Sequence, residues 1–187
     1  SHERTVERNR DAWEANAYRA WVVRHGAPSE AAAALRADPR APLRRVLSAV
    51  GDPDGMVVAV PLGSHGRVAT SLALLGARVT VFDVSESNAR YARELAAEVG
   101  VPLDYVVGDF RATASGHPSA FDAVVMDLGI VHYFVHIERF VASVRSLLVP
   151  DARLVLSEFH PLAKTCGGIQ YSAVNCGQLE NSGESHC

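Results

Sequence analysis

The chain has 187 residues, of which 48% are hydrophobic and 21% charged, and its formal net charge is −3. This length and composition are typical of one globular domain and exclude a wholly disordered or fibrous protein. A sequence pI near 6.2 argues against a dedicated nucleic-acid surface, which needs clustered Lys and Arg. Because no apolar run reaches the roughly 18 residues that span a bilayer, and because the polar start lacks a signal-peptide core, we expect a cytoplasmic protein with no membrane partner.

Residues 1–50 predict a helical unit at the start of the chain. Apolar residues recur at helical spacing between charged ones over residues 3–24, which indicates one amphipathic helix. Gly26-Ala27-Pro28 ends it, and Ser29 can cap a short alanine-rich helix over residues 29–36. Pro42 can open a third helix over residues 43–50. The first helix carries aromatic side chains that either form a lid over a site or pack against the next layer; these are Trp13, Tyr18 and Trp21.

Residues 51–162 predict an α/β core, because short apolar runs alternate there with helical patterns. Continuous Val, Leu and Phe content is typical of strands that are buried on both faces of a parallel sheet. Strands that alternate with helices imply right-handed crossovers and an open, doubly wound sheet. The five predicted strands cover residues 56–60, 78–82, 103–107, 121–126 and 153–157.

The turn after the first predicted strand carries the first candidate binding residues, Pro61-Leu62-Gly63-Ser64-His65-Gly66. Glycine lets a ligand approach the backbone closely, and a helix N-terminus offers free N–H groups to an anionic group. Asp83 follows the second predicted strand at 20 residues from Gly63, near the spacing at which a carboxylate meets a ribose diol. The loop and Asp83 together indicate an adenosine-type ligand; a plain tight turn and a helix-capping Asp are the structural alternatives.

Polar and aromatic residues also follow the later strands. After the third strand, Asp109 can accept a hydrogen bond from an exocyclic amine while Phe110 packs against a ring; otherwise Asp109 is a surface carboxylate. Because ligands in such sheets bind outside the carboxyl ends of the strands, we expect the remaining candidates at the same edge. They are Asp127, His132, Tyr133, Glu158 and His160.

Five segments carry a family resemblance. They are Asn9-Arg10-Asp11-Ala12-Trp13, Leu62-Gly63-Ser64-His65-Gly66, the stretch from Leu74 to Ser85 (LLGARVTVFDVS), the stretch from Asp127 to Phe134 (DLGIVHYF), and Ser157-Glu158-Phe159-His160-Pro161. In this order, over residues 6–162, they resemble the class I S-adenosylmethionine-dependent methyltransferases. The details resemble a bacterial, small-molecule branch with a Gly-Ser-His-Gly loop.

The resemblance implies a Rossmann-like, mainly parallel sheet that binds S-adenosylmethionine. The 63–66 loop would hold the amino-acid part of the cofactor, and Asp83 would bind its ribose hydroxyls. Asp109 and Phe110 would flank the adenine, while residues 128–129 would line the floor near the sulfonium. The expected cofactor residues are Leu62, Gly63, Ser64, His65, Gly66, Asp83, Val84, Asp109, Phe110, Asp127, Leu128 and Gly129.

Two features depart from the family pattern. Most members have an acidic residue in the first strand, ahead of a G-x-G-x-G loop, where this chain has Ala59 and Pro61. The family also closes with a helix and an antiparallel strand pair, whereas residues 163–187 have the composition of an irregular tail, and only residues 169–174 fit a sixth strand. We therefore expect the closing strands to be missing. An unpaired edge on the fifth strand then favours a homodimer or a partner that covers it.

All three cysteines lie in this tail, at Cys166, Cys176 and Cys187. An odd number in a cytoplasmic composition favours free thiols over a disulfide framework. A zinc site that also uses His186 is disfavoured, because the short Cys-x₂₋₄-Cys pair is absent. We therefore expect no metal.

The interpretation that follows is a lid over residues 1–50, a cofactor-binding core over 51–162 and a tail over 163–187. The expected reaction is methyl transfer to a small molecule by in-line displacement, which depends mainly on alignment of the acceptor. His132 or His160 is the candidate general base if the acceptor must lose a proton, and Tyr133 would shape the acceptor pocket. A non-catalytic, partner-dependent subunit is the first alternative. A nucleotide-dependent oxidoreductase is the second, and the missing G-x-G-x-x-G argues against it.

Overall fold

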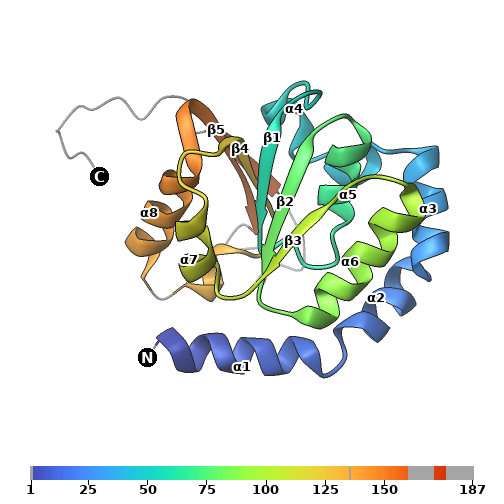
Figure 1. Cartoon of the computed structure of the whole chain (residues 1–187), viewed down its shortest axis with the longest axis horizontal. Coiled ribbons are helices and arrows are strands. Elements are labelled where there is room, and N and C mark those ends of the chain that lie inside the picture. The colour runs from blue at the N-terminus through green and yellow to red at the C-terminus, as the bar shows by residue number, and fades with distance from the viewer. Residues whose placement is uncertain (1, 135, 160–170, 176–187) are drawn as a thin grey trace.

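The computed structural model describes residues 2–134, 136–159 and 171–175. In this part of the chain one sheet lies between two layers of helices (Figure 1). The strands are β1 (Val57–Pro61), β2 (Arg78–Asp83), β3 (Asp104–Val107), β4 (Phe121–Asp127), β5 (Leu148–Phe159) and β6 (Tyr171–Asn175). The α-helices are α1 (His2–Glu14), α2 (Ala17–His25), α3 (Pro28–Ala37), α4 (Leu47–Val50), α5 (Arg67–Leu74), α6 (Glu86–Val99), α7 (Phe110–Thr113) and α8 (Ile137–Leu147). Short 3₁₀ turns lie at Ala41–Leu43 (η1), Ala114–Gly116 (η2) and Val131–Tyr133 (η3).

The strand order is β3-β2-β1-β4-β5-β6, and the first five of these strands are parallel. The chain order therefore reverses between β1 and β4, and the crevice beyond the carboxyl ends of these two strands is the place where such sheets bind ligands. The doubly wound sheet expected from the sequence is confirmed. In Figure 1, α1 runs along the end of the sheet at which the parallel strands finish.

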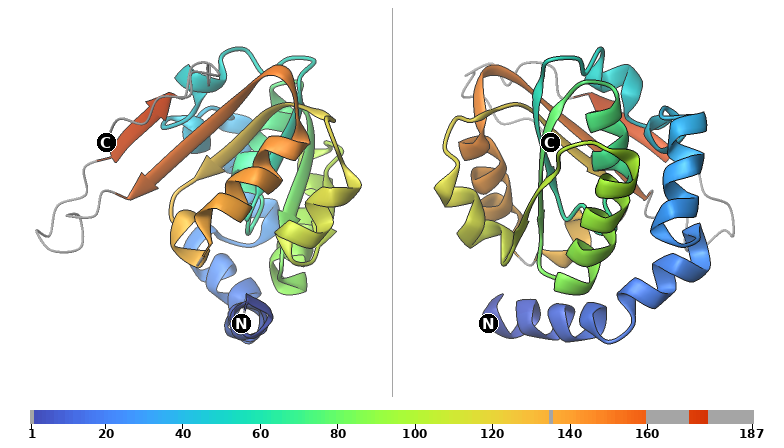
Figure 2. Two further views of the ribbon diagram at one scale, coloured as in Figure 1. Left: turned by 90° about the vertical axis from the view of Figure 1, so that its left-hand side faces the viewer. Right: turned by 45° about the vertical axis from the view of Figure 1, so that its right-hand side comes forward.

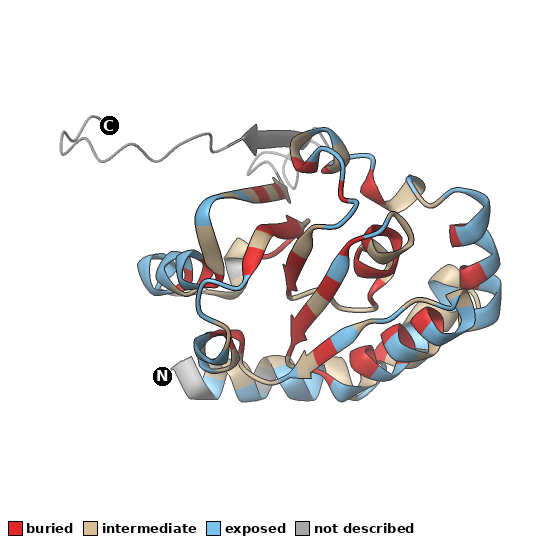
Figure 3. Ribbon diagram, turned by 45° about the horizontal axis from the view of Figure 1, so that its top comes forward, coloured by how far each residue is buried: buried red, intermediate tan, exposed pale blue. Residues whose placement is uncertain are grey.

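The two faces of the sheet bury alternate residues of each strand, as a pleated strand requires. Val58 and Val60 pack into a core with α5 and α6, whereas Ala59 lies in a second core with α7 and α8. Figure 3 shows the result, with buried residues concentrated in the central strands and exposed residues on the outer sides of the helices. Burial on both faces explains why these strands have continuous apolar sequences.

The N-terminal helices differ from expectation in their bounds. The single helix predicted over residues 3–24 is wrong, because a turn at Ala15 and Asn16 separates α1 from α2. Asn favours turns because its short polar side chain competes for backbone hydrogen bonds. The third predicted helix, over residues 43–50, is reduced to η1 and the four-residue α4.

The start of α3 also differs from the prediction. Pro28 is the first residue of α3, and Ala27 precedes it in place of the predicted cap Ser29. The Glu30 carboxylate accepts a hydrogen bond of 2.8 Å from the Ala27 N–H, so the first turn of α3 is closed from within the helix.

The end of the sheet corrects a second expectation. β6 pairs antiparallel with β5, from Val155 opposite Asn175 to Phe159 opposite Tyr171. The left view of Figure 2 shows the two strands beside each other and running in opposite directions. The closing strands are therefore not missing altogether, and the tail over residues 163–187 is not irregular throughout. The β5 edge that was expected to be open is paired within the same chain, which removes the reason for expecting a homodimer or a covering partner at that edge.

In the described residues, none of the helices has the length and apolar character that crossing a membrane requires.

Candidate active site

A cavity of about 540 Å³ lies at the carboxyl ends of β1 to β4, and its volume is within the usual range for a small-ligand site. Its wall includes every cofactor residue expected from the sequence except Gly66. The cavity thus coincides with the reversal of strand order between β1 and β4. Those lining residues are Leu62, Gly63, Ser64, His65, Asp83, Val84, Asp109, Phe110, Asp127, Leu128 and Gly129.

Backbone strain is concentrated in the cavity wall. Leu62 and Ser64 in the loop after β1 both have φ of 50°, and Leu128 after β4 has φ of 62°. Among the described residues, only two other non-glycine residues have positive φ. Left-handed conformations of this kind cost about 1–3 kcal/mol each and cluster where a protein must present its backbone to a ligand. The strain therefore marks both loops as parts of a built site.

The glycines of the loop after β1 also have a packing role that the sequence did not indicate. A Cβ added to Gly63 would lie 2.7 Å from Val81 Cγ1, and one added to Gly66 would lie 2.5 Å from Ala92 Cβ. Both glycines thus allow the loop to pack closely on β2 and α6. Gly66 is not among the residues that line the cavity; at φ of 73° it is the left-handed residue that directly precedes α5 as its N-cap.

Asp83 ends β2 with its carboxylate in the cavity wall and only 7% of the residue exposed. Its Oδ2 accepts a hydrogen bond of 3.0 Å from the Ser64 N–H, and its Oδ1 accepts bonds from the Ser85 N–H at 3.0 Å and from the Asn88 amide at 3.2 Å. Burial raises the pKa of Asp83 above its ordinary value, and these bonds partly offset the rise. A buried carboxylate on a cavity wall is a typical feature of a functional site.

Asp109 and Phe110 begin the segment after β3. The Asp109 carboxylate caps α7 by accepting a bond of 3.3 Å from the Arg111 N–H. The Phe110 ring packs in the second core, 5.9 Å from the ring of Phe82 and edge-on to it. Both residues reach the cavity wall, so one carboxylate and one apolar ring lie together where the adenine was expected.

Asp127 at the end of β4 is held by a residue that the sequence did not indicate. Arg45, which precedes α4, binds both carboxylate oxygens of Asp127, at 3.0 Å from Nε and 2.7 Å from Nη2. Such a two-pronged pair fixes the orientation of the carboxylate. The separation of 82 residues explains why no local pattern in the sequence indicated it.

Glu158 near the end of β5 anchors the loop after β4. Its carboxylate accepts bonds from the N–H groups of Gly129 at 3.0 Å and Val131 at 2.6 Å, and also from the Ile130 N–H. The loop that includes Leu128 and Gly129 is thereby tied to the neighbouring strand. The sequence predicted only that Glu158 lies at the carboxyl edge of the sheet. In the structure its carboxylate has a structural role, because it holds three backbone N–H groups of this loop.

The expected catalytic residues are placed only in part. Tyr133 lines the cavity from η3, and His132 precedes it in the same 3₁₀ turn. His160 lies outside the described residues, as do the three cysteines. Among the residues that are described, no three His, Cys, Asp or Glu side chains gather as metal ligands.

The wall of the cavity opposite the strand ends comes from α1 and α2. The ring of His65 stacks on Trp21, with centroids 4.3 Å apart, and on His25 at 4.7 Å. Trp13 stacks on Trp21 in turn, at 5.9 Å. Trp13 and Trp21 therefore line the cavity, whereas Tyr18 packs on α6, and the lid over residues 1–50 stays a prediction.

The aromatic stack includes two histidines with lowered pKa values, and two arginines lie close to it. Burial lowers the pKa of His65 to about 3 and that of His25 to about 4, and the nearby Arg24 and Arg67 contribute to both shifts. Both imidazoles are therefore neutral at pH 7. Arg67 lies 3.1 Å from His25 Nδ1, while its own Nε and the Nδ1 of His65 are buried with no hydrogen-bond partner among the described residues. A polar ligand group in the cavity would satisfy such atoms.

Comparisons of the sequence with known proteins agree with this geometry. Residues 62–151 match a family model described as a methyltransferase domain. The ubiquinone biosynthesis O-methyltransferase of Chromobacterium violaceum is 31% identical over 110 residues, which are 59% of this chain and 40% of that protein. The protein of the same name from Methylocella silvestris is 34% identical over 100 residues, or 54% and 38%. These matches support the resemblance to S-adenosylmethionine-dependent methyltransferases that the sequence predicts.

Solved structures agree with this chain in fold. Magnesium protoporphyrin IX methyltransferase from Synechocystis PCC 6803, crystallised with bound SAH, superposes with a TM-score of 0.61 at 19% identity, over 89% of this chain and 82% of that one. An S-adenosylmethionine-dependent methyltransferase from Mesorhizobium loti gives a TM-score of 0.56 at 21% identity, over 75% and 66%. The chain spans about 40% of the length of the two curated relatives.

Proposed function

We propose that this chain is a methyltransferase that binds S-adenosylmethionine across the carboxyl ends of β1 to β4 and transfers its methyl group to a small-molecule acceptor. One observation carries the proposal. The cavity at the reversal of strand order gathers the buried carboxylate of Asp83 and two strained loops in a single wall. A carboxylate that can accept from a vicinal diol, next to backbone presented to a ligand, suits an adenosine-containing cofactor.

The residues present fit the cofactor in chemistry. Asp83 supplies the carboxylate for the ribose hydroxyls, and Val84 and Phe110 supply apolar surface for a base. The buried Ser64 Oγ and His65 Nδ1, which lack partners among the described residues, suit the polar amino-acid part. When bound, S-adenosylmethionine supplies a methyl group that its sulfonium already activates.

The chain contributes alignment more than chemistry to this reaction. Leu128 and Gly129, held by Glu158, would form the floor beneath the reacting methyl group. Trp13 and Trp21 would exclude water from the opposite wall and orient the acceptor, which is the kind of contribution that positioning makes to in-line displacement. Tyr133 would contact the acceptor, and His132 or His160 would accept its proton if one is lost.

An oxygen acceptor on a small molecule is favoured by the curated relatives, which are named as O-methyltransferases. We also place this function in the cytoplasm, as proposed from composition. Neither a homodimer nor a partner is part of the proposal, since β6 pairs with the β5 edge.

The test is calorimetric titration of S-adenosylhomocysteine into the chain, with NAD as the control ligand. We expect one site with micromolar affinity for S-adenosylhomocysteine and no binding of NAD. Asp83→Ala should weaken binding about 10- to 100-fold, because a charge-assisted contact is lost. Asp104→Ala removes an exposed carboxylate at the opposite end of the neighbouring strand and should leave affinity unchanged.

Transfer of a labelled methyl group from S-adenosylmethionine to a panel of phenolic acceptors then separates the alternatives. Product formation supports an enzyme. Cofactor binding without transfer to any acceptor would favour the non-catalytic subunit. Binding of NAD in place of S-adenosylhomocysteine would favour the oxidoreductase and overturn the proposal.

A further inference from the structure

A buried asparagine connects the N-terminal helices to the carboxylate proposed for cofactor binding. Asn88 lies in the first turn of α6 and is 1% exposed. Its Oδ1 accepts a hydrogen bond of 2.7 Å from the indole Nε1–H of Trp21, on α2. Its amide Nδ2 donates to Asp83 Oδ1 at 3.2 Å. Two consecutive hydrogen bonds, from Trp21 to Asn88 and from Asn88 to Asp83, thus connect α2 with the end of β2.

The chemistry of both partners fixes the orientation of the Asn88 amide. Trp21 Nε1 can only donate, and an ionised Asp83 can only accept. A flipped amide would place donor against donor and acceptor against acceptor. Asn provides both an N–H donor and a carbonyl acceptor on a side chain of this length. Asp lacks the donor, and Leu lacks both groups.

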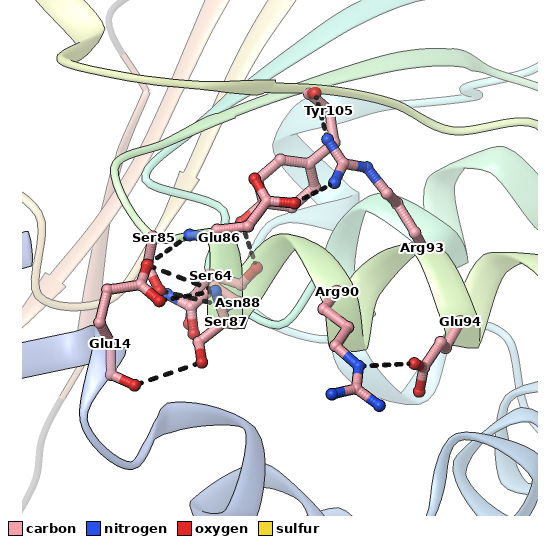
Figure 4. Close-up of polar contacts among 10 residues, drawn as sticks. All are labelled: Glu14, Ser64, Ser85, Glu86, Ser87, Asn88, Arg90, Arg93, Glu94 and Tyr105. Carbon is pink, nitrogen blue, oxygen red and sulfur yellow. Dashed lines mark hydrogen bonds and ion pairs between the residues drawn. The ribbon is translucent and has the colours of Figure 1, made fainter.

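The position of Asn88 is fixed from the helix as well. Its backbone N–H donates to Ser85 Oγ at 3.1 Å, in the cap of α6 that Figure 4 shows. Ser85 also donates its N–H to Asp83 Oδ1. Asn88 and the carboxylate are therefore held against the same turn, so a displacement of the Asn88 side chain alters the bonds of Asp83 directly.

We propose that Asn88 is a positioning residue that makes the orientation of Asp83 depend on the docking of α2 through Trp21. The proposal rests on the proposed function, because it assigns Asp83 to the cofactor. Its consequence is that the N-terminal helices contribute to cofactor affinity from a distance, in addition to lining the acceptor side of the cavity.

Two conservative variants on α2 test this coupling. Trp21→Phe keeps an aromatic ring on His65 and removes the indole donor to Asn88. Tyr18→Phe removes the hydroxyl that donates to Glu94, so it also deletes one bond between α2 and α6, away from Asp83. We expect Trp21→Phe to weaken S-adenosylhomocysteine binding about 3- to 10-fold, as for one lost hydrogen bond, and Tyr18→Phe to change it less than about twofold. Equal losses in the two variants would mean that α2 acts only through helix packing.

Asn88→Asp supplies a readout that a purely structural role would not change. The introduced carboxylate can accept from Trp21 but repels Asp83, so the pair should share a proton as pH falls. We expect weak binding at pH 8 that recovers toward the wild-type value near pH 5. Asn88→Leu should bind weakly at both values. The wild-type profile at the same pH values corrects for the other titratable and charged groups. His65 and Arg67 share the cavity wall with Asp83, and Tyr105, which interacts with Asp83, also interacts with Glu14, Glu86 and Arg93.

A ligand-free measurement keeps this proposal separate from the cofactor assignment. In Asp83→Asn the Asn88 amide loses its charged acceptor, so NMR should show hydrogen exchange at the Trp21 indole accelerated about threefold or more. The Trp13 indole is the internal control. Unchanged exchange at Trp21 would overturn the coupling. Failure of the wild-type chain to bind S-adenosylhomocysteine, with accelerated exchange at Trp21, would instead remove the proposed function and leave the coupling standing.

Discussion

Asp83 is buried and His65 is half-buried in the same cavity wall, and desolvation shifts their pKa values in opposite directions. Desolvation raises the pKa of Asp83 and lowers that of His65 to about 3, because both shifts favour the neutral form. The two therefore have opposite effects on stability as pH changes. In the pH range between the ordinary and the raised pKa of Asp83, the folded state binds more protons, so rising pH lowers stability. In the range from about pH 3 to pH 6.5, the unfolded state binds more protons at His65, so rising pH increases stability.

His65→Phe tests the second effect. In the wild type, His65 is neutral when folded but protonated when unfolded at pH 5, which costs about 2 kcal/mol of stability relative to pH 7.5. Phe keeps a ring in the stack and cannot titrate, so the fall in Tm between pH 7.5 and pH 5 should be about 4–8 °C smaller than in the wild type. Scanning calorimetry at the two pH values measures it. His136→Phe, at an exposed histidine, is the control. A fall as large as that of the wild type would show that His65 titrates normally.

At the scale of elements, α1 is attached to the cofactor side of the sheet through Glu14. The Glu14 carboxylate accepts bonds from the Ser87 N–H at 3.2 and 3.3 Å and from the Glu86 N–H, at the start of α6 (Figure 4). An anionic group there satisfies N–H groups that have no partner within the helix and interacts favourably with the helix dipole. Glu14 thus supplements the cap that Ser85 provides.

Glu14→Ala should lower the free energy of unfolding by about 1 kcal/mol, the usual cost of a lost helix cap. Urea denaturation measures the loss, and hydrogen exchange should show faster opening of α1. Glu7→Ala on the same helix removes an exposed carboxylate and serves as the control. If both variants lose the same stability, the contact with α6 contributes nothing.

At the scale of the whole molecule, the cavity joins distant parts of the chain. Its wall runs from Val6 on α1 to Phe134 after β4, and it includes the ends of the central strands. A ligand that binds only this assembled site stabilises the folded chain as a unit by mass action.

S-adenosylhomocysteine at 100 times its dissociation constant should therefore stabilise the chain by about 2.7 kcal/mol. For a chain of this size the rise in Tm is about 5–10 °C. Differential scanning fluorimetry measures it, with NAD as the control. A rise that is the same with NAD would count against a specific adenosyl site.

The layers of the core and the edge of the sheet at which the site lies could be predicted from the sequence. Strands such as β1 and β2 are buried on both faces, so their continuous apolar runs are a strong local signal. Residues that follow such strands must lie at one edge of a parallel sheet, which is why Asp83, Leu128 and Gly129 could be placed from the sequence.

The contacts that complete the site could not be predicted from the sequence and are seen only in the folded chain. Arg45 meets Asp127 across 82 residues, and Trp21 meets Asn88 across 67, and neither pairing has a local sequence pattern. The pairing of β6 with β5 and the break between α1 and α2 also depend on what each segment packs against. Local propensity and periodicity describe neighbours along the chain, whereas these contacts arise only when distant segments are brought together by burial of the common core.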